Sequence, residues 1–264
     1  MKKTFGNIYI LIIMLFLYLP IMALIVLSFN EAKSMAVFTG FSLKWYDELF
    51  NSDLMISAMF NTFTIAIVSA LIATVVGTMA VIGMNAMKKK SQNALMGFNN
   101  IPLLNADIVT GISLMLFMLI LQIPRGYGTI LFSHTTFCIP YVILSVKPRV
   151  NKRTESLYEA ALDLGATGRY AFRKIVFPEL WPGIFSGFLL SFTMSVDDFI
   201  ITYFTRGAGI NTISTLIYSQ VKVGIRPSLF ALSTIIFVAA LVVLVIINIR
   251  QSKTDKRNKM VFNL

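Results

Sequence analysis

Charged residues are scarce in this sequence: Asp, Glu, Lys and Arg make up 13% of its 264 residues, about half the roughly 25% typical of soluble proteins. Hydrophobic residues account for 56%, and the mean hydropathy is +0.77. A water-soluble domain of this size would expose much of that apolar surface to water. A lipid bilayer solvates such surface, so the composition predicts an integral membrane protein.

Cysteine and histidine are almost absent, and their scarcity excludes two classes of site. The single cysteine, Cys138, excludes an internal disulfide. The single histidine, His134, has no partner at metal-ligand spacing, so we expect a buried or pore-lining polar residue and no metal site. The phosphate-binding loop Gly-x-x-x-x-Gly-Lys-Ser/Thr is also missing, so we do not expect this chain to hydrolyse ATP itself.

Apolar runs long enough to cross a bilayer occur six times in the sequence. Crossing about 30 Å of hydrocarbon at about 1.5 Å per residue takes roughly 20 helical residues. Each run holds 19 or more, and together they cover residues 8–29, 58–84, 101–123, 128–146, 182–204 and 228–249. The first run is longer than a signal-peptide core and lacks a clear cleavage site, so we expect an uncleaved anchor. We predict an all-α membrane protein in which residues 1–264 form a single transmembrane domain.

Basic residues are distributed unequally between the segments that connect these runs. Of the 23 Lys and Arg residues, 17 fall on one side of the predicted membrane, together with both termini and residues 147–181. Cytoplasmic loops carry the excess of Lys and Arg, so both termini and this loop are expected in the cytoplasm. The net charge of +11 then reflects topology, and nucleic acid is not expected as a partner.

Two further patterns predict packing surfaces. The second run carries small residues at spacings of three and four, a pattern that favours close approach of another helix. These residues are Ala66, Ala70, Ala73 and Gly77. The external segment 30–57 mixes aromatic and polar residues, as a short interfacial helix does. Such a helix would serve either as a membrane-surface anchor or as a docking site for a partner.

The largest predicted cytoplasmic loop, residues 147–181, contains a short amphipathic helix. Four apolar residues recur at helical spacing: Leu157, Ala160, Ala161 and Leu164. This spacing predicts a helix over Glu155–Leu164 with one apolar stripe. Gly165 suits the position just after a helix end, and Gly168 suits a second sharp turn. The helix would lie across the cytoplasmic face and offer its apolar side to another protein.

Three of the twelve acidic residues lie inside the predicted spans: Asp107, Asp197 and Asp198. A carboxylate near the bilayer centre costs about 2.5–3.5 kcal/mol on insertion scales, so such residues usually face a cavity. Asp107 follows Pro102 and Asn105, which favour an interrupted helix and a polar pocket. The alternative for each acid is a structural role as a polar contact between helices.

The fifth run separates the two adjacent aspartates by helical direction. Its polar residues form one stripe, Ser191, Ser195, Asp198 and Thr202, and Asp197 points about 100° away. We therefore expect Asp198 to face a solute path and Asp197 to bond a neighbouring helix or subunit. Phe199 and Tyr203 lie four residues apart and would offer aromatic faces to a cation, unless they pack or face lipid. The residues expected along the path are Asp107, Asp197, Asp198, Ser195, Thr202 and Tyr203.

The cytoplasmic loop also contains a motif with fixed gaps: Glu159-Ala160-Ala161, then Gly165, then Ile175-x-Phe177-Pro178. It resembles the signature of the inner-membrane subunits of binding-protein-dependent ABC importers, with Phe177 at a position where that family usually has Leu. Further stretches extend the resemblance to the permease subunits of spermidine/putrescine importers over most of the chain. These stretches are residues 41–46, 107–113, 132–140, 190–198 and 217–224.

The resemblance implies a fold, a location and partners. It implies a MetI-like permease fold with six transmembrane helices in the bacterial plasma membrane, and a transport subunit that is not an enzyme. It implies that this chain binds no cofactor and that ATP and Mg²⁺ bind a separate ATPase dimer. It further implies a second homologous permease and an extracytoplasmic substrate-binding protein. The loop helix would contact the ATPase through Glu159, Ala160, Ala161, Leu164, Gly165, Ala166, Gly168 and Pro178.

Three other functions compete with polyamine import. The first is import of a different small solute by the same kind of complex. The second is an intramembrane aspartyl protease with Asp107 and Asp198 as its pair, but no Gly-x-Gly-Asp motif is present and the loop motif would have no purpose. The third is a channel that needs no ATP. Stoichiometric ATP use and co-purification with a soluble ATPase separate the importer from the last two.

Overall fold

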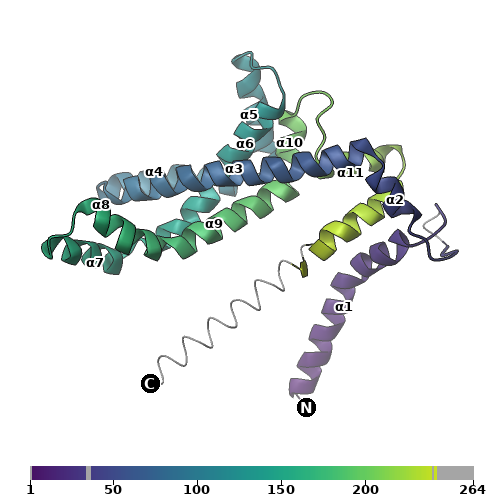
Figure 1. Ribbon diagram of the computed structural model, residues 1–264, viewed down its shortest axis with the longest axis horizontal. Coiled ribbons are helices and arrows are strands. Elements are labelled where there is room, and N and C mark those ends of the chain that lie inside the picture. The colour runs from purple at the N-terminus through teal and green to yellow at the C-terminus, as the bar shows by residue number, and fades with distance from the viewer. Residues whose placement is uncertain (1, 34–36, 240, 243–264) are drawn as a thin grey trace. The chain divides into compact units, whose positions relative to one another are not determined.

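The computed structural model describes residues 2–33, 37–239 and 241–242 (Figure 1). The described chain is helical, with one isolated antiparallel bridge between Asn30 and Phe41 as its β-type pairing. It divides into two compact units, one formed by residues 1–56 with 217–264 and the other by residues 57–216. Each unit is described by itself below.

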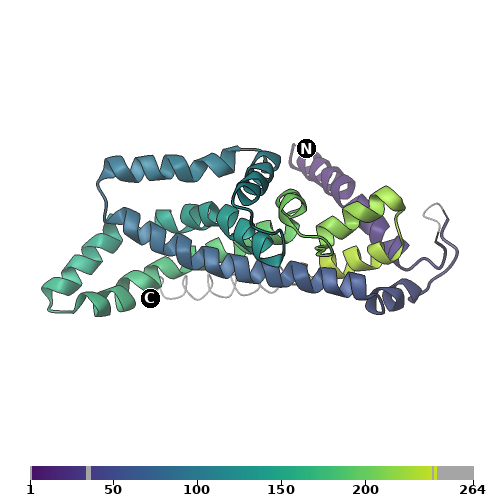
Figure 2. The same cartoon turned by 90° about the horizontal axis from the view of Figure 1, so that it is seen from above.

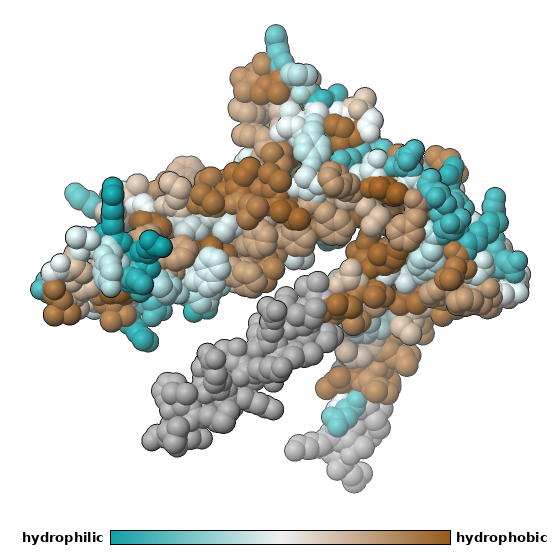
Figure 3. All heavy atoms as spheres, viewed as in Figure 1, coloured by the Kyte–Doolittle hydropathy of each residue, from teal (hydrophilic) through white to brown (hydrophobic). Residues whose placement is uncertain are grey.

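The helices follow the order expected for a multi-span membrane protein. Their bounds are α1 Lys2–Ser28, α2 Lys44–Phe50, α3 Asp53–Asn85, α4 Lys89–Leu104, α5 Asp107–Ile120, α6 Tyr127–Val146, α7 Lys152–Asp163, α8 Gly168–Ala171, α9 Phe177–Asp197, α10 Ile200–Thr205 and α11 Ile213–Val223. A further apolar helix covers Ser228–Ala239. In the described residues, four helices are long and apolar enough to cross a membrane, or five if α4 and α5 form one bent span. Figure 3 shows hydrophobic residues along α3 and α1 and hydrophilic ones gathered around α7 and α8.

The first unit contains the N-terminal helix and the short helix expected in segment 30–57. The predicted first span, 8–29, corresponds to the apolar part of α1, Tyr9–Ser28. Helix α2 packs on the end of α1: the Trp45 indole donates to the Asn30 carbonyl, and the hydroxyls of Tyr46 and Ser28 lie 2.8 Å apart. Trp45 is therefore buried rather than displayed on the surface. The predicted last span, 228–249, begins where a helix begins, and its end lies outside the described residues.

Two predicted spans are not the continuous helices that we expected. In place of one helix over 101–123, α4 ends at Leu104 and α5 begins at Asp107, with an angle of 105° between them (Figure 2). In place of one helix over 182–204, α9 ends at Asp197 and α10 begins at Ile200. The interruption anticipated near Asp107 is confirmed, whereas the one at Asp198 was missed. The spans predicted at 58–84 and 128–146 match α3 and α6 closely.

The core of the second unit lies where α3, α6 and α9 pack together. Helix α9 runs beside α6 (Figures 1 and 2), and the buried cluster includes Ala73, Val81, Cys138, Val142, Leu180 and Ile184. Glycines permit the closest approaches: a Cβ on Gly187 would lie 3.2 Å from the Val142 Cα. The small-residue stripe of α3 is buried as predicted, since Ala66, Ala70 and Ala73 are fully buried. Close contact through small residues is the expected basis of helix association in lipid.

Gly77 offers a direct test of this packing. An added Cβ would lie 2.8 Å from Val142 Cβ and Cγ1. Overpacking costs about 1–3 kcal/mol, so Gly77→Ala should lower the melting temperature and the yield of the purified complex. A Val142→Gly change removes both of these atoms and should restore part of the loss in the double variant. Gly83→Ala is the matched control on α3, because its Cβ would meet nothing within 4 Å. Equal melting temperatures for the Gly77 and Gly83 variants would contradict the packing account.

Candidate functional site

The break between α9 and α10 is built by the side chain of Asp198. Its backbone is extended, with φ −63° and ψ 129°, so the helix stops there. Its carboxylate accepts hydrogen bonds from the backbone N–H of Ile201 at 3.1 Å and of Thr202 at 2.8 Å. Asp198 precedes the N-cap residue of α10, Phe199, and its carboxylate replaces the carbonyl partners that the first turn lacks. The residue that places a charge in the span therefore also interrupts the helix.

The break between α4 and α5 has a similar form. Asn105 and Ala106 are extended, and Asp107 occupies the first turn of α5, where a carboxylate favours the helix N-terminus. Helices α5 and α10 lie against each other because Gly111 leaves room for the Phe204 ring, which would lie 3.1 Å from an added Cβ. This contact brings the two broken segments to one place.

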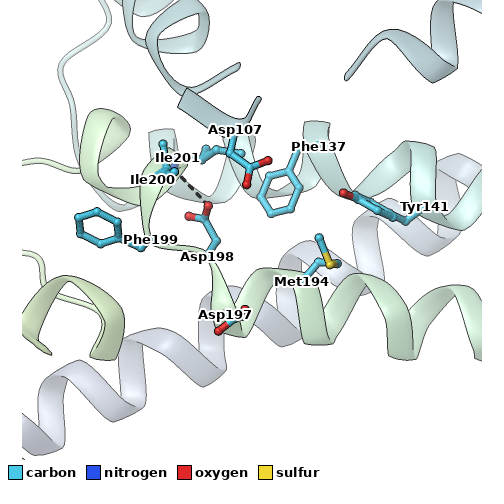
Figure 4. Close-up of a pocket in the computed structure, with 9 residues that line it drawn as sticks. All are labelled: Asp107, Phe137, Tyr141, Met194, Asp197, Asp198, Phe199, Ile200 and Ile201. Carbon is cyan, nitrogen blue, oxygen red and sulfur yellow. Dashed lines mark hydrogen bonds between the residues drawn. The ribbon is translucent and has the colours of Figure 1, made fainter. Parts of the chain in front are cut away.

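A cavity of about 260 Å³ opens between these breaks (Figure 4). Nine residues line it: Asp107, Phe137, Tyr141, Met194, Asp197, Asp198, Phe199, Ile200 and Ile201. Figure 4 shows the three carboxyl groups around the space, with the rings of Phe137 and Tyr141 from α6 beside them. None of the nine is basic. An acidic, aromatic-lined cavity at interrupted helices suits a cation, because carboxylates and ring faces replace water around an ammonium group.

The three aspartates differ in their surroundings. Asp198 is held inside the chain, with its side chain 8% exposed and His134 Nε2 at 3.4 Å from Oδ2. Asp107 and Asp197 are exposed in this single chain. No other described residue donates a hydrogen bond to the Asp197 carboxylate, so the expected bond to a neighbouring helix is not seen in the described chain. A bond from Asp197 to a partner subunit stays a prediction.

The other predicted path residues lie elsewhere. Ser195 and Thr202 are buried, and both hydrogen-bond to His134 rather than lining the cavity. Tyr203 lines a second, larger cavity of about 680 Å³, where the Arg206 guanidinium lies 5.7 Å from its ring centroid. That second cavity also contains Arg125. Tyr203 does not line the acidic cavity, but the centroid of its ring lies 5.5 Å from that of Phe199, which does.

The sequence did not predict that side chains of α6 line the acidic cavity. Phe137 and Tyr141 lie three and seven residues after His134, so all three share one face of a helix. A polar residue followed by aromatic residues at helical spacing in a predicted span was the available signal. His134 was expected to be a buried or pore-lining polar residue, and it is buried, at 1% exposure. Within the described ranges, no group of three metal-ligating side chains is positioned to hold a metal ion.

The predicted loop helix is present as α7, Lys152–Asp163. Its N-cap Asn151 accepts from the Thr154 N–H at 3.1 Å. At the other end Gly165 has φ +85°, and its N–H donates to the Leu162 carbonyl at 2.8 Å. The Ala166 N–H donates to the Ala161 carbonyl at 3.0 Å, which completes a Schellman ending. The expectation that Gly165 follows the helix end is confirmed.

The apolar side of α7 is available for contact. Leu157 is 39% exposed and Leu164 is 89% exposed, and Glu159 and Ala160 are also exposed. Gly168 begins α8 with an ordinary backbone, and a Cβ there would lie 3.2 Å from the Tyr158 hydroxyl. The backbone at Gly168 has no positive φ, so the glycine serves close packing against Tyr158. Pro178 lies in the first turn of α9, directly after the π-helical turn of Phe172–Val176, inside a helical run that extends from Gly168 to Asp197.

Comparison with known proteins identifies the family. Residues 73–257 match the family described as "Binding-protein-dependent transport system inner membrane component". The chain belongs to this family. It is a multi-pass membrane transport subunit and not itself an enzyme.

Individual relatives agree with the family assignment. The chain is 36% identical over 240 residues to the spermidine/putrescine transport system permease protein PotC of Haemophilus influenzae, covering 91% of this chain and 93% of that protein. It is 38% identical over 228 residues to the putrescine transport system permease protein PotI of Escherichia coli K12, covering 84% of this chain and 81% of that protein. A solved bacterial ABC transporter involved in the import of the acidic polysaccharide alginate has the same fold. Its TM-score is 0.72 at 13% identity, over 95% of this chain and 96% of that one.

Proposed function

We propose that this chain is a pore-forming subunit of an ATP-driven importer for polyamines such as spermidine and putrescine. The proposal is carried by the acidic cavity, where three carboxylates and three aromatic rings meet at two helix breaks and no basic side chain is present. The names of the relatives point to the same class of cargo.

The charge of the cavity selects the class of cargo. A polyamine carries two or more ammonium groups and loses water from them as it crosses the bilayer. Carboxylates and aromatic faces compensate that loss, whereas an anionic cargo would be repelled. The alginate importer that shares this fold takes an acidic polysaccharide, so the fold alone does not set the cargo. Weak contact suits a conduit, because the cargo must leave the site again.

Energy for transport enters through the α7 segment in this account. The exposed residues from Glu159 to Gly168 contact an ATPase dimer, and Pro178 begins the helix that leads to Asp197. The Asn85 amide donates to Glu155 at 3.0 Å and links α7 to the end of α3. Closure of the ATPase dimer would move α7 and, through it, the helices that line the cavity.

We also propose the arrangement in the membrane. Six spans follow from the six apolar runs of the sequence, with α4 and α5 sharing one bent span, and the charge distribution places both termini in the cytoplasm. The chain pairs with a second, homologous permease in the bacterial plasma membrane. A substrate-binding protein docks on the external loops, including residues 30–57. ATP and Mg²⁺ bind the ATPase and not this chain.

Competition for uptake tests the cargo. Cells lacking other polyamine importers would express the whole system and take up labelled putrescine. Excess unlabelled putrescine or spermidine should reduce uptake of the label at least about tenfold, because each competes for a site selective for multiple ammonium groups. An amino acid or a sugar at the same concentration is the control and should leave uptake unchanged. Equal competition by the sugar would reject polyamine selectivity.

A further inference from the structure

His134 is a buried polar residue that the transport mechanism above does not use. It lies on α6 and is 1% exposed, and its ring reaches residues of α9, α10 and the break between them. Burying an imidazole in a membrane span is costly unless both of its nitrogens have partners. Its hydrogen-bond partners connect it to the acidic cavity.

Both ring nitrogens make short contacts. His134 Nδ1 lies 2.6 Å from Ser195 Oγ, and Nε2 lies 2.8 Å from Thr202 Oγ1. The same Nε2 faces Asp198 Oδ2 at 3.4 Å. Ser195 Oγ in turn lies 3.2 Å from Ser69 Oγ on α3. One side chain therefore ties α6 to both sides of the α9–α10 break, and Ser195 extends the link to α3.

Counting protons assigns the direction of the key contact. The Thr202 hydroxyl has one proton and donates it to Asp198 Oδ2 at 2.8 Å. Its oxygen must therefore accept from His134, so Nε2 carries a hydrogen. At the other nitrogen, Ser195 can donate to Nδ1 of a neutral ring, or accept from it when the ring is an imidazolium. In both states, Nε2–H points at the Thr202–Asp198 pair.

We infer that His134 is a positioning residue that holds the Asp198 carboxylate in the wall of the cavity through Nε2–H. Asp198 Oδ2 then receives the Thr202 N–H and hydroxyl and faces the His134 N–H, while Oδ1 accepts from Ile201. A carboxylate held in this way keeps its charge beside the path without closing on a passing ammonium group. Asp107 and Asp197, which lack such partners among the described residues, remain free to follow the cargo. This role of His134 rests on the proposed function.

Conservative variants distinguish positioning from core filling. Glutamine places its amide N–H close to where Nε2 lies, whereas asparagine reaches only toward the Nδ1 position, and leucine fills the space without polar atoms. Uptake per assembled complex in proteoliposomes should fall about tenfold or more for His134→Leu and His134→Asn, and less than about threefold for His134→Gln. Ser133→Ala is the control, because the hydroxyl of this buried neighbour donates to the Thr129 carbonyl of its own helix and has no other hydrogen-bond partner among the described residues.

A second measurement tests the contact between His134 and Asp198 independently of transport. Melting temperatures of the complex are compared for wild type, His134→Leu, Asp198→Asn and the double variant, and the two losses should be clearly less than additive. Additive melting shifts, or equal uptake by the Gln and Leu variants, would overturn the positioning role. If the wild-type complex takes up no polyamine, the proposed function fails. The melting cycle then still decides whether His134 and Asp198 act together.

Discussion

A Gly165→Val variant is expected to lose about nine-tenths or more of ATP-coupled uptake while its membrane helices still assemble. Gly165 has φ +85° at the end of α7, and a non-glycine residue pays roughly 1–2 kcal/mol in that region, with β-branched residues paying most. A Cβ there would meet nothing within 4 Å, so the cost is conformational and not steric. Uptake and ATP hydrolysis by the reconstituted complex measure the effect, and hydrolysis should lose its coupling to uptake.

Asparagine provides the matched control at the same position. It tolerates the left-handed region better than other non-glycine residues, so Gly165→Asn should retain uptake within about threefold of wild type. A graded series from Asn through Ala to Val would show that the shape of the α7 ending matters. Wild-type uptake by the valine variant would remove this segment from the coupling mechanism.

Neutralising the free acids of the cavity should have the second large effect. Asp107→Asn and Asp197→Asn should each slow polyamine uptake about tenfold, because a hydrogen bond to a charged group contributes about 1.5–3 kcal/mol. Assembly of the Asp107 variant should be unaffected, since its side chain is exposed, and the amount of assembled complex formed by the Asp197 variant tests the bond predicted from Asp197 to a partner subunit. Initial rates at saturating loaded binding protein isolate the step within the membrane.

Glu179→Gln is the control for the acid variants. Glu179 is an exposed acid in the first turn of α9 and does not line the cavity. Its loss changes the net charge of the chain by the same amount and should leave the rate unchanged. Equal slowing in all three variants would point to a general charge effect and would remove the cavity from the path.

The sequence predicted the helices whose signals are local. Length and hydropathy were enough for α1, α3 and α6, and a glycine after an amphipathic stripe was enough for the α7 ending. The stripe of small residues on α3 was also readable, because close packing in lipid requires them. None of these features depends on knowing a distant contact.

The site was harder to predict because its shape depends on side chains that satisfy the backbone. By hydropathy the region around Asp198 is one apolar run. In the structure, the Asp198 carboxylate replaces two backbone carbonyls as a hydrogen-bond acceptor, and the helix ends there. The polar stripe containing Ser195 and Thr202 suggested a path, but those hydroxyls are used by His134 from another helix. Helical periodicity correctly placed Ser195 and Thr202 on one face, but it could not show which side chain of another helix contacts that face.

Two features of the chain work together in this account. One is a cavity where two interrupted helices bring three carboxyl groups together. The other is the exposed α7, followed closely by the start of α9, which ends at the cavity with Asp197. A force applied at α7 thus has a continuous route through α8 and α9 to the acids that the cargo passes.

Reconstitution into proteoliposomes with the ATPase, the second permease and the loaded binding protein tests the central claim most directly. The quantity to measure is ATP-dependent accumulation of labelled spermidine inside the vesicles. We predict accumulation by the wild-type complex and almost none when Asp107, Asp197 and Asp198 are all replaced by asparagine in an otherwise intact assembly. Undiminished accumulation by that triple variant would contradict the claim that the cargo crosses the membrane past these carboxylates.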